Sequence, residues 1–120
     1  MKKIVKCIVA DEYITGDGVS LGAAGSYNDV LLELTFSPMW EGAEKQVVWK
    51  DAHGGNKTTQ PLTEEMRVDG TNTYRVPVPA TAKQVEGVCS MYVTGTVTVD
   101  GEVVSCTTTE RAYFLVLPSL

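Results

Sequence analysis

Apolar and polar residues alternate along several short stretches of this chain, a pattern typical of β-strands with one buried face. The clearest stretch covers residues 30–36, where Leu32, Leu34 and Phe36 fall on one face and the charged and hydroxyl side chains on the other. The Gly-rich stretch 16–25 is predicted to be a loop. We predict strands at residues 2–10, 30–36, 46–50, 73–78, 88–99, 102–108 and 112–117, a weak strand within 57–67, and single helical turns near Glu64 and at 80–84.

These elements predict an all-β fold. Val, Thr and Ile supply 34 of the 120 residues, and such β-branched side chains pack well on a pleated surface. We therefore predict a two-sheet sandwich of immunoglobulin-like or jelly-roll type, built from seven or eight short antiparallel strands with almost no helix. The length fits one domain, which is predicted to span residues 1–120.

The cysteines are predicted to be free and buried. An Asp-Gly pair at 100–101 predicts a two-residue hairpin turn. Pairing about that turn places Cys106 opposite Gly95 and Cys89 opposite Ala112, so these two thiols lie far apart. The odd total of three cysteines also favours a reducing site of synthesis over a disulfide framework.

Charge and hydropathy exclude two classes of partner. Ten Lys and Arg against fifteen Asp and Glu give a net charge of −5, which disfavours binding to a phosphate backbone. No apolar run approaches the roughly 20 residues that a membrane helix needs. Lys6 interrupts the apolar stretch near the N-terminus, so we predict a strand there and no signal peptide. Nucleic acid and membrane are therefore not expected as partners.

Motifs that could carry catalysis or bind metal lack the context they need. Gly18–Gly22 matches the GxSxG pattern around Ser20, but that nucleophile requires a preceding strand, a following helix and a nearby His base. His53 is the only histidine and lies in a Gly-rich loop. The three Asp-Gly pairs match no calcium-loop pattern and are interpreted as turns. We predict no catalytic residue, no metal and no cofactor, and conclude that the chain is not an enzyme.

The two tryptophans differ in their surroundings. Trp49 lies within an apolar strand and is predicted to be core. Trp40 follows Pro38 and Met39 where a strand ends, and it is the better candidate for partial exposure. An exposed aromatic ring could stack on a sugar, so Trp40 or Tyr92 is the platform in a carbohydrate-binding alternative.

A series of short motifs resembles a known group of proteins. In chain order the motifs are Gly22-x-x-Gly25-x-Tyr27-Asn28 before the strand 30–36, Trp40-Glu41-Gly42 before Val47-Val48-Trp49, Val76-Pro77-Val78-Pro79, Tyr92-Val93-Thr94-Gly95 and Thr107-Thr108-Thr109. This order is similar to the immunoglobulin-like N-terminal modules of upper baseplate and tail-fibre proteins in phages and prophages of Gram-positive gut bacteria. The similarity spans most of residues 14–117.

The resemblance implies a non-enzymatic assembly module of a phage tail or baseplate that mediates protein–protein docking. It implies other virion proteins as partners, location in the virion after synthesis in the bacterial cytoplasm, and homo-oligomers, because tails are built on rotational symmetry. From side-chain type and loop position we predict partner contacts at Tyr27, Met39 and Trp40. The alternatives are a carbohydrate-binding or adhesin-type sandwich and, third, a hydrolase centred on Ser20.

Overall fold

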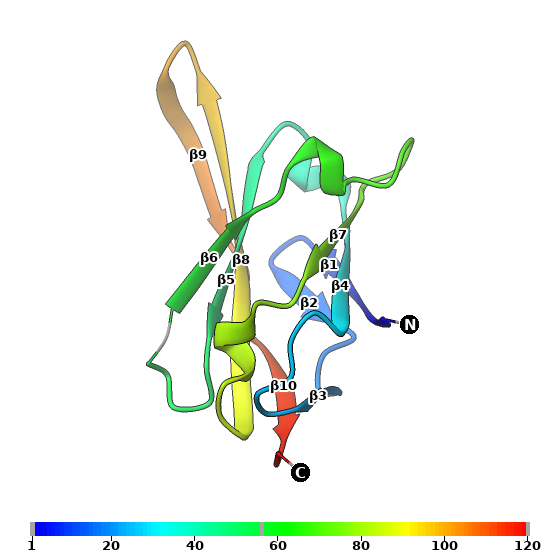
Figure 1. Cartoon of the computed structure of the whole chain (residues 1–120). Coiled ribbons are helices and arrows are strands. Elements are labelled where there is room, and N and C mark those ends of the chain that lie inside the picture. The colour runs from blue at the N-terminus through cyan, green and yellow to red at the C-terminus, as the bar shows by residue number, and fades with distance from the viewer. Residues whose placement is uncertain (1, 56, 120) are drawn as a thin grey trace.

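The computed structural model describes residues 2–55 and 57–119, and the regular elements in this part of the chain are strands and three short 3₁₀ turns (Figure 1). The strands are β1 (Lys3–Ala10), β2 (Tyr13–Thr15), β3 (Ser20–Ala23), β4 (Val30–Phe36), β5 (Glu44–Lys50), β6 (Lys57–Pro61), β7 (Thr73–Pro77), β8 (Gly87–Val99), β9 (Glu102–Thr108) and β10 (Ala112–Leu117). Three 3₁₀ turns join them: η1 (Pro38–Trp40), η2 (Glu64–Met66) and η3 (Ala80–Lys83). The predicted loop at 16–25 is wrong for residues 20–23, which form β3.

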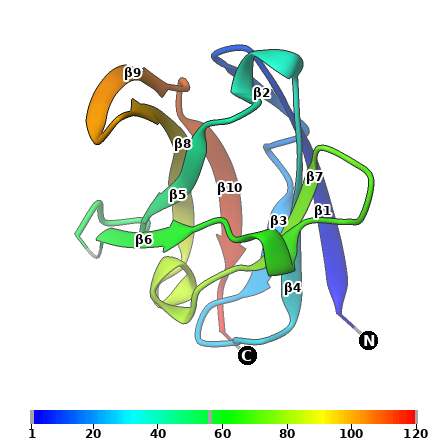
Figure 2. The same cartoon turned by 90° about the horizontal axis from the view of Figure 1, so that it is seen from above.

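The strands form two sheets that face each other, as the view from above shows (Figure 2). One sheet has the order β2-β1-β4-β7, and the other has the order β3-β10-β8-β5-β6, with β9 beside β8. The predicted all-β sandwich is confirmed. The described residues form ten strands, where seven or eight were predicted. Two of the strand pairs, β1 with β4 and β3 with β10, are parallel, where antiparallel pairing was predicted. Parallel neighbours need a crossover, and between β1 and β4 the chain crosses into the other sheet as β3.

Alternate residues of the facing strands fill the space between the sheets. Trp49 is fully buried, as predicted, and its ring centroid lies 6.0 Å from that of Phe114. In β8 the residues that face the other sheet and are fully buried include Cys89, Met91 and Val93. Other buried members of this alternation include Val5, Cys7 and Val9 in β1, Val30, Leu32, Leu34 and Phe36 in β4, Tyr74 and Val76 in β7, and Ala112 and Val116 in β10.

The longest strand, β8, extends beyond the body of the sandwich. Its first part pairs with β10 and its last part with β9, while β5 pairs along its other side. Residues 96–107, from the end of β8 through most of β9, form a projecting hairpin that we call the arm (Figure 1). The turn at the tip has positive φ at Asp100 (51°) and Gly101 (81°), as a type I′ turn requires. The predicted hairpin is confirmed.

The pairing register departs from the prediction a few residues from the turn. Val99 pairs with Glu102 as expected, but a bulge after Val97 shifts the ladder by one residue. Cys106 therefore lies opposite Thr96 instead of Gly95. Cys89 belongs to the separate ladder between β8 and β10, where it pairs with Phe114 instead of Ala112. Cys7 and Cys89 are buried free thiols, whereas Cys106 is exposed, which corrects the prediction for that residue.

A buried ion pair connects η3 to the loop before β4. The Lys83 side chain is 1% exposed, and its Nζ donates a hydrogen bond of 2.8 Å to Asp29 Oδ1. Asp29 is 45% exposed, so water solvates one side of the pair. A buried ammonium is costly without a counterion. Asp29 thus allows the helical turn at 80–83 to pack against the sandwich.

Asp29→Asn is expected to lower the free energy of unfolding by about 1–3 kcal/mol at pH 7, less than for a fully buried pair because Asp29 is partly solvated. The hydrogen bond from Lys83 holds the pKa of Asp29 below its ordinary value of 3.8. This stabilisation is therefore complete above the unfolded pKa near 4 and is lost as the pH falls through the lowered folded pKa. Urea unfolding of both proteins should show the difference shrinking below pH 4.

Glu64→Gln serves as the control for this experiment, because Glu64 pairs with Arg67 at the exposed surface. Its effect on stability should be small at every pH. An Asp29→Asn penalty that stays unchanged in the most acidic buffers would contradict the role assigned to Lys83 and Asp29.

Candidate functional surfaces

The three residues predicted to contact a partner do not share one environment. Tyr27 is 69% exposed and Met39 is 48% exposed, but Trp40 is only 1% exposed. The expected partial exposure of Trp40 is wrong, because η1 carries its ring into the core. Trp40 therefore cannot stack on a sugar ring as a surface platform.

Tyr27 and Met39 also lie apart from each other. Tyr27 precedes β4 and Met39 follows it, so the two residues flank opposite ends of a seven-residue strand. At about 3.3 Å per residue, that strand separates its ends by about 20 Å. The structure does not bring Tyr27, Met39 and Trp40 together in one patch.

Trp40 closes one end of the sandwich. Its Nε1 donates a hydrogen bond of 2.8 Å to the carbonyl oxygen of Asp11, and its ring centroid lies 5.4 Å from that of Phe36. The ring packs directly over Gly95 in the opposite sheet, where an added Cβ would lie 2.6 Å from the indole. A glycine inside a strand often marks such a close approach, and Gly95 was the signal in the sequence that could have located Trp40.

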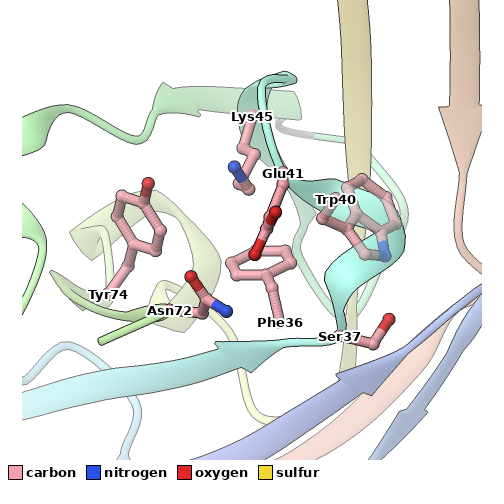
Figure 3. A pocket seen from close by; sticks show the side chains of 7 residues that line it. All are labelled: Phe36, Ser37, Trp40, Glu41, Lys45, Asn72 and Tyr74. Carbon is pink, nitrogen blue, oxygen red and sulfur yellow. The ribbon is translucent and has the colours of Figure 1, made fainter. Parts of the chain in front are cut away.

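A small hollow beside Trp40 is lined by Phe36, Ser37, Trp40, Glu41, Lys45, Asn72 and Tyr74 (Figure 3). Lys45 Nζ lies 5.4 Å from the centroid of the Phe36 ring and 5.3 Å from that of Tyr74, within cation–π range. Burial is the main cause that lowers the pKa of Lys45. The hollow measures about 20 Å³, which is room for one water molecule and not for a substrate.

The structure does not assemble a nucleophile from the GxSxG motif. Ser20 begins β3, and its Oγ accepts a hydrogen bond of 2.9 Å from the Gly22 N–H. His53 follows β5, which is separated from β3 by β8 and β10. Three strand spacings amount to about 14 Å. The strand β3 continues after Ser20 where a nucleophile elbow would need a helix.

Neither buried thiol is a candidate nucleophile at neutral pH. Burial raises the pKa of Cys7 to about 12 and that of Cys89 to about 11, so neither forms a thiolate at neutral pH.

In residues 2–55 and 57–119 no group of three or more His, Cys, Asp or Glu side chains could hold a metal ion. In the same ranges no buried side-chain N or O atom lacks a hydrogen-bond partner. Among the helical segments in this part of the chain, none is long and apolar enough to span a membrane.

Exposed apolar side chains gather in three places, one of which is the outer face of the smaller sheet at Ile4, Ile8 and Tyr13. A second is the outer face of the larger sheet, where Leu115 of β10 pairs with Val88 of β8 beside Tyr113. The third is the arm, where Val99, Val103 and Val104 are 53%, 65% and 60% exposed. Apolar surface of this kind is what protein–protein interfaces bury. These surfaces are candidate functional sites of the molecule.

A comparison with solved structures finds a similar fold in a known protein. The structure is similar to the N-terminal domain of phage TP901-1 ORF48, with a TM-score of 0.64 and 11% sequence identity over 96% of this chain and 98% of that one. No protein-family model matches the sequence, and no curated protein matches it. The likeness at this low identity establishes a shared fold along nearly the whole of both chains.

Proposed function

We propose that this chain is a non-enzymatic assembly module of a phage tail or baseplate that docks on other virion proteins. The observation that carries the proposal is the fold shared with a phage domain over 96% of this chain. The short motifs between residues 14 and 117, which resemble those of phage baseplate and tail-fibre modules, support it from the sequence side.

The physical properties of the molecule fit an assembly role. Two packed sheets form a rigid frame that can dock without reorganising, which lowers the entropic cost of association. The exposed apolar side chains lie on strand faces, on the arm and in loops, where a neighbour can reach them. Tyr27 and Met39 remain the proposed partner contacts, on two separate surfaces. Virion location, synthesis without a signal peptide and homo-oligomerisation belong to the same proposal.

The proposal predicts that the chain is a stoichiometric component of phage particles. Quantitative mass spectrometry of gradient-purified particles should detect its tryptic peptides, such as residues 58–67 and 68–75, in a constant ratio to the tail proteins. Peptides of a host cytoplasmic protein serve as the control for contamination. Particles that are infectious but lack these peptides would contradict the proposal.

A second candidate function is carbohydrate binding, and one observation favours it. An open hollow of about 340 Å³ on the larger sheet is lined by Tyr92, Thr94, Thr108, Thr109 and Arg111. An aromatic ring beside hydroxyl groups could hold a sugar. Because both tryptophans are buried, calorimetry with cell-wall glycans is a better test than tryptophan fluorescence. The assembly role predicts no heat of binding, whereas heat that Tyr92→Ala abolishes would favour the alternative.

A further inference from the structure

We propose that the outer face of the larger sheet binds an acidic protein surface, in which carboxylates lie beside apolar side chains. The partner is a neighbouring virion protein, so the inference rests on the proposed assembly role and adds to it the docking face and the chemistry of the partner. Two lysines that face each other across neighbouring strands, next to exposed apolar side chains of β8 and β10, carry the inference.

The two lysines are Lys50 of β5 and Lys57 of β6. They are register partners, so both side chains point to the same face of the sheet. That face is the outer one, because the adjacent Trp49 is fully buried between the sheets. Like charges directly opposite each other destabilise a sheet. Among the described residues neither lysine forms an ion pair, so the fold itself does not neutralise this charge.

The outer face of the smaller sheet shows the opposite arrangement. There Glu33 lies between Lys6 and Arg75 in one cross-strand row. Arg75 Nε lies 2.9 Å from Glu33 Oε1. A carboxylate within that sheet therefore balances its cations. On the larger sheet no carboxylate of the described strands stands in the row of Lys50 and Lys57, so a partner can supply it.

Acidic side chains are scarce around the two lysines. In the outward positions of the described strands β5, β6, β8 and β10 the one acidic residue is Glu44, six residues or about 20 Å from Lys50 along β5. Two loop acids bind backbone N–H groups instead. Asp51 is 6% exposed, and its Oδ1 accepts two N–H groups of its own loop. Asp17 accepts the N–H of Tyr113 on the β3 side of β10, about three strand spacings or 14 Å from Lys50.

An apolar surface continues from the lysines across the same face. Lys50 pairs with Ser90 of β8, which pairs with Tyr113 of β10, so Tyr113 is two strand spacings or about 10 Å from Lys50. The next outward pair of β8 and β10 is Val88 with Leu115. The apolar side chains of these two strands are between 44% and 51% exposed at Val88, Tyr113 and Leu115. A cationic area thus adjoins an apolar one, the combination that protein interfaces use as rim and centre.

This combination favours a protein over a glycan or a membrane as the partner. Aliphatic side chains such as Leu115 gain little from a sugar, whereas a protein interface buries them. Anionic bilayers attract clusters of roughly four to eight basic residues, and this chain carries a net charge of −5. An acidic protein surface needs carboxylates only opposite Lys50 and Lys57. Because the rest of the chain repels acidic partners, charge also orients the docking.

Lys57→Glu tests the role of the lysines without harming the fold. The substitution places a carboxylate opposite Lys50, which is a favourable cross-strand pair, so the variant should unfold at the same urea concentration as the parent chain or a higher one. In phage particles assembled from equal amounts of variant and parent, we expect about tenfold lower incorporation of the variant. Lys6→Gln is the matched control, because Lys6 is an exposed cation on the outer face of the other sheet. Its incorporation should equal that of the parent.

Cross-linking of purified particles with a carbodiimide identifies the partner. The reagent condenses a lysine amine with a carboxylate in contact with it, taking up the water that is lost, and mass spectrometry locates both residues. We expect Lys50 or Lys57 to be linked to an Asp or Glu of another virion protein, and Lys6 not to be.

Three results would each overturn the inference and leave the assembly role standing. They are particles that contain the chain but lack this link, links from Lys50 or Lys57 only to a glycan or to a second copy of this chain, and equal incorporation of Lys57→Glu and the parent. Particles that lack the chain altogether would overturn the assembly role and the inference together.

Discussion

Trp40→Ala is expected to lower the free energy of unfolding by about 3–5 kcal/mol, the range for truncating a fully buried aromatic side chain. Trp40 is 1% exposed, packs against Phe36 and covers Gly95 of the opposite sheet. Its removal leaves a cavity between the sheets and an unpaired carbonyl at Asp11, which loses the indole N–H. Urea denaturation monitored by circular dichroism measures the difference in the free energy of unfolding between the parent chain and Trp40→Ala.

Met39→Ala is the matched control, because Met39 lies in the same 3₁₀ turn but is 48% exposed. Its effect on stability should be within about 0.5 kcal/mol. If Trp40→Ala proved no more destabilising than Met39→Ala, the indole would not be a core side chain, and the placement of η1 against β8 would be wrong.

Gly16→Ala is expected to cost about 2–4 kcal/mol, for two reasons that act together. Gly16 has a φ of 94°, a conformation that side chains disfavour. A Cβ at this position would also lie 2.3 Å from the backbone carbonyl oxygen of Lys6 in β1, which cannot rotate away. The clash would push the segment after β2 off the edge of β1.

Gly18→Ala separates these two causes. Gly18 has a similar φ of 85°, but an added Cβ would meet no atom within 4 Å. It should therefore show only the conformational cost of about 1–2 kcal/mol. Equal losses for the two variants in parallel urea titrations would mean that Gly16 does not approach Lys6 as closely as described.

Strands with a clear period of two were predictable from local sequence. In β4 the alternation of Leu32, Leu34 and Phe36 with polar residues gave the bounds Val30–Phe36 directly. The I′ turn at Asp100 and Gly101 likewise fixed the start of the β8–β9 ladder. In both cases the information lies within a few residues, because burial and turn geometry act locally on the chain.

Features that depend on distant partners were not predictable. β2 and β3 have three and four residues, too few to show a period, and they exist because β1 and β10 pair with them. The parallel pairing of β1 with β4 leaves no local signal, since the alternation is the same in either direction. The bulge after Val97 shifted the register for the same reason, and Cys106 is exposed because both faces of the projecting β9 are.

The predicted contact residues also divide into those whose environment follows from the local sequence and those whose environment depends on distant partners. The exposure of Tyr27 and Met39 agreed with their loop positions, but Trp40 was misplaced because its burial depends on Gly95, 55 positions along the chain. The burial of Lys83 could not be predicted from its neighbours in the sequence either, since its counterion Asp29 comes from another loop. The opposition of Lys50 and Lys57 emerged only from the pairing of β5 with β6.

Electron microscopy of gold-labelled phage particles tests the central claim most directly. Antibodies against this chain, applied to purified particles, should place gold at the end of the tail that carries the baseplate and fibres. Particles assembled without the chain serve as the unlabelled control. Gold that is absent from intact particles, or that decorates only the capsid, would contradict a role in tail or baseplate assembly.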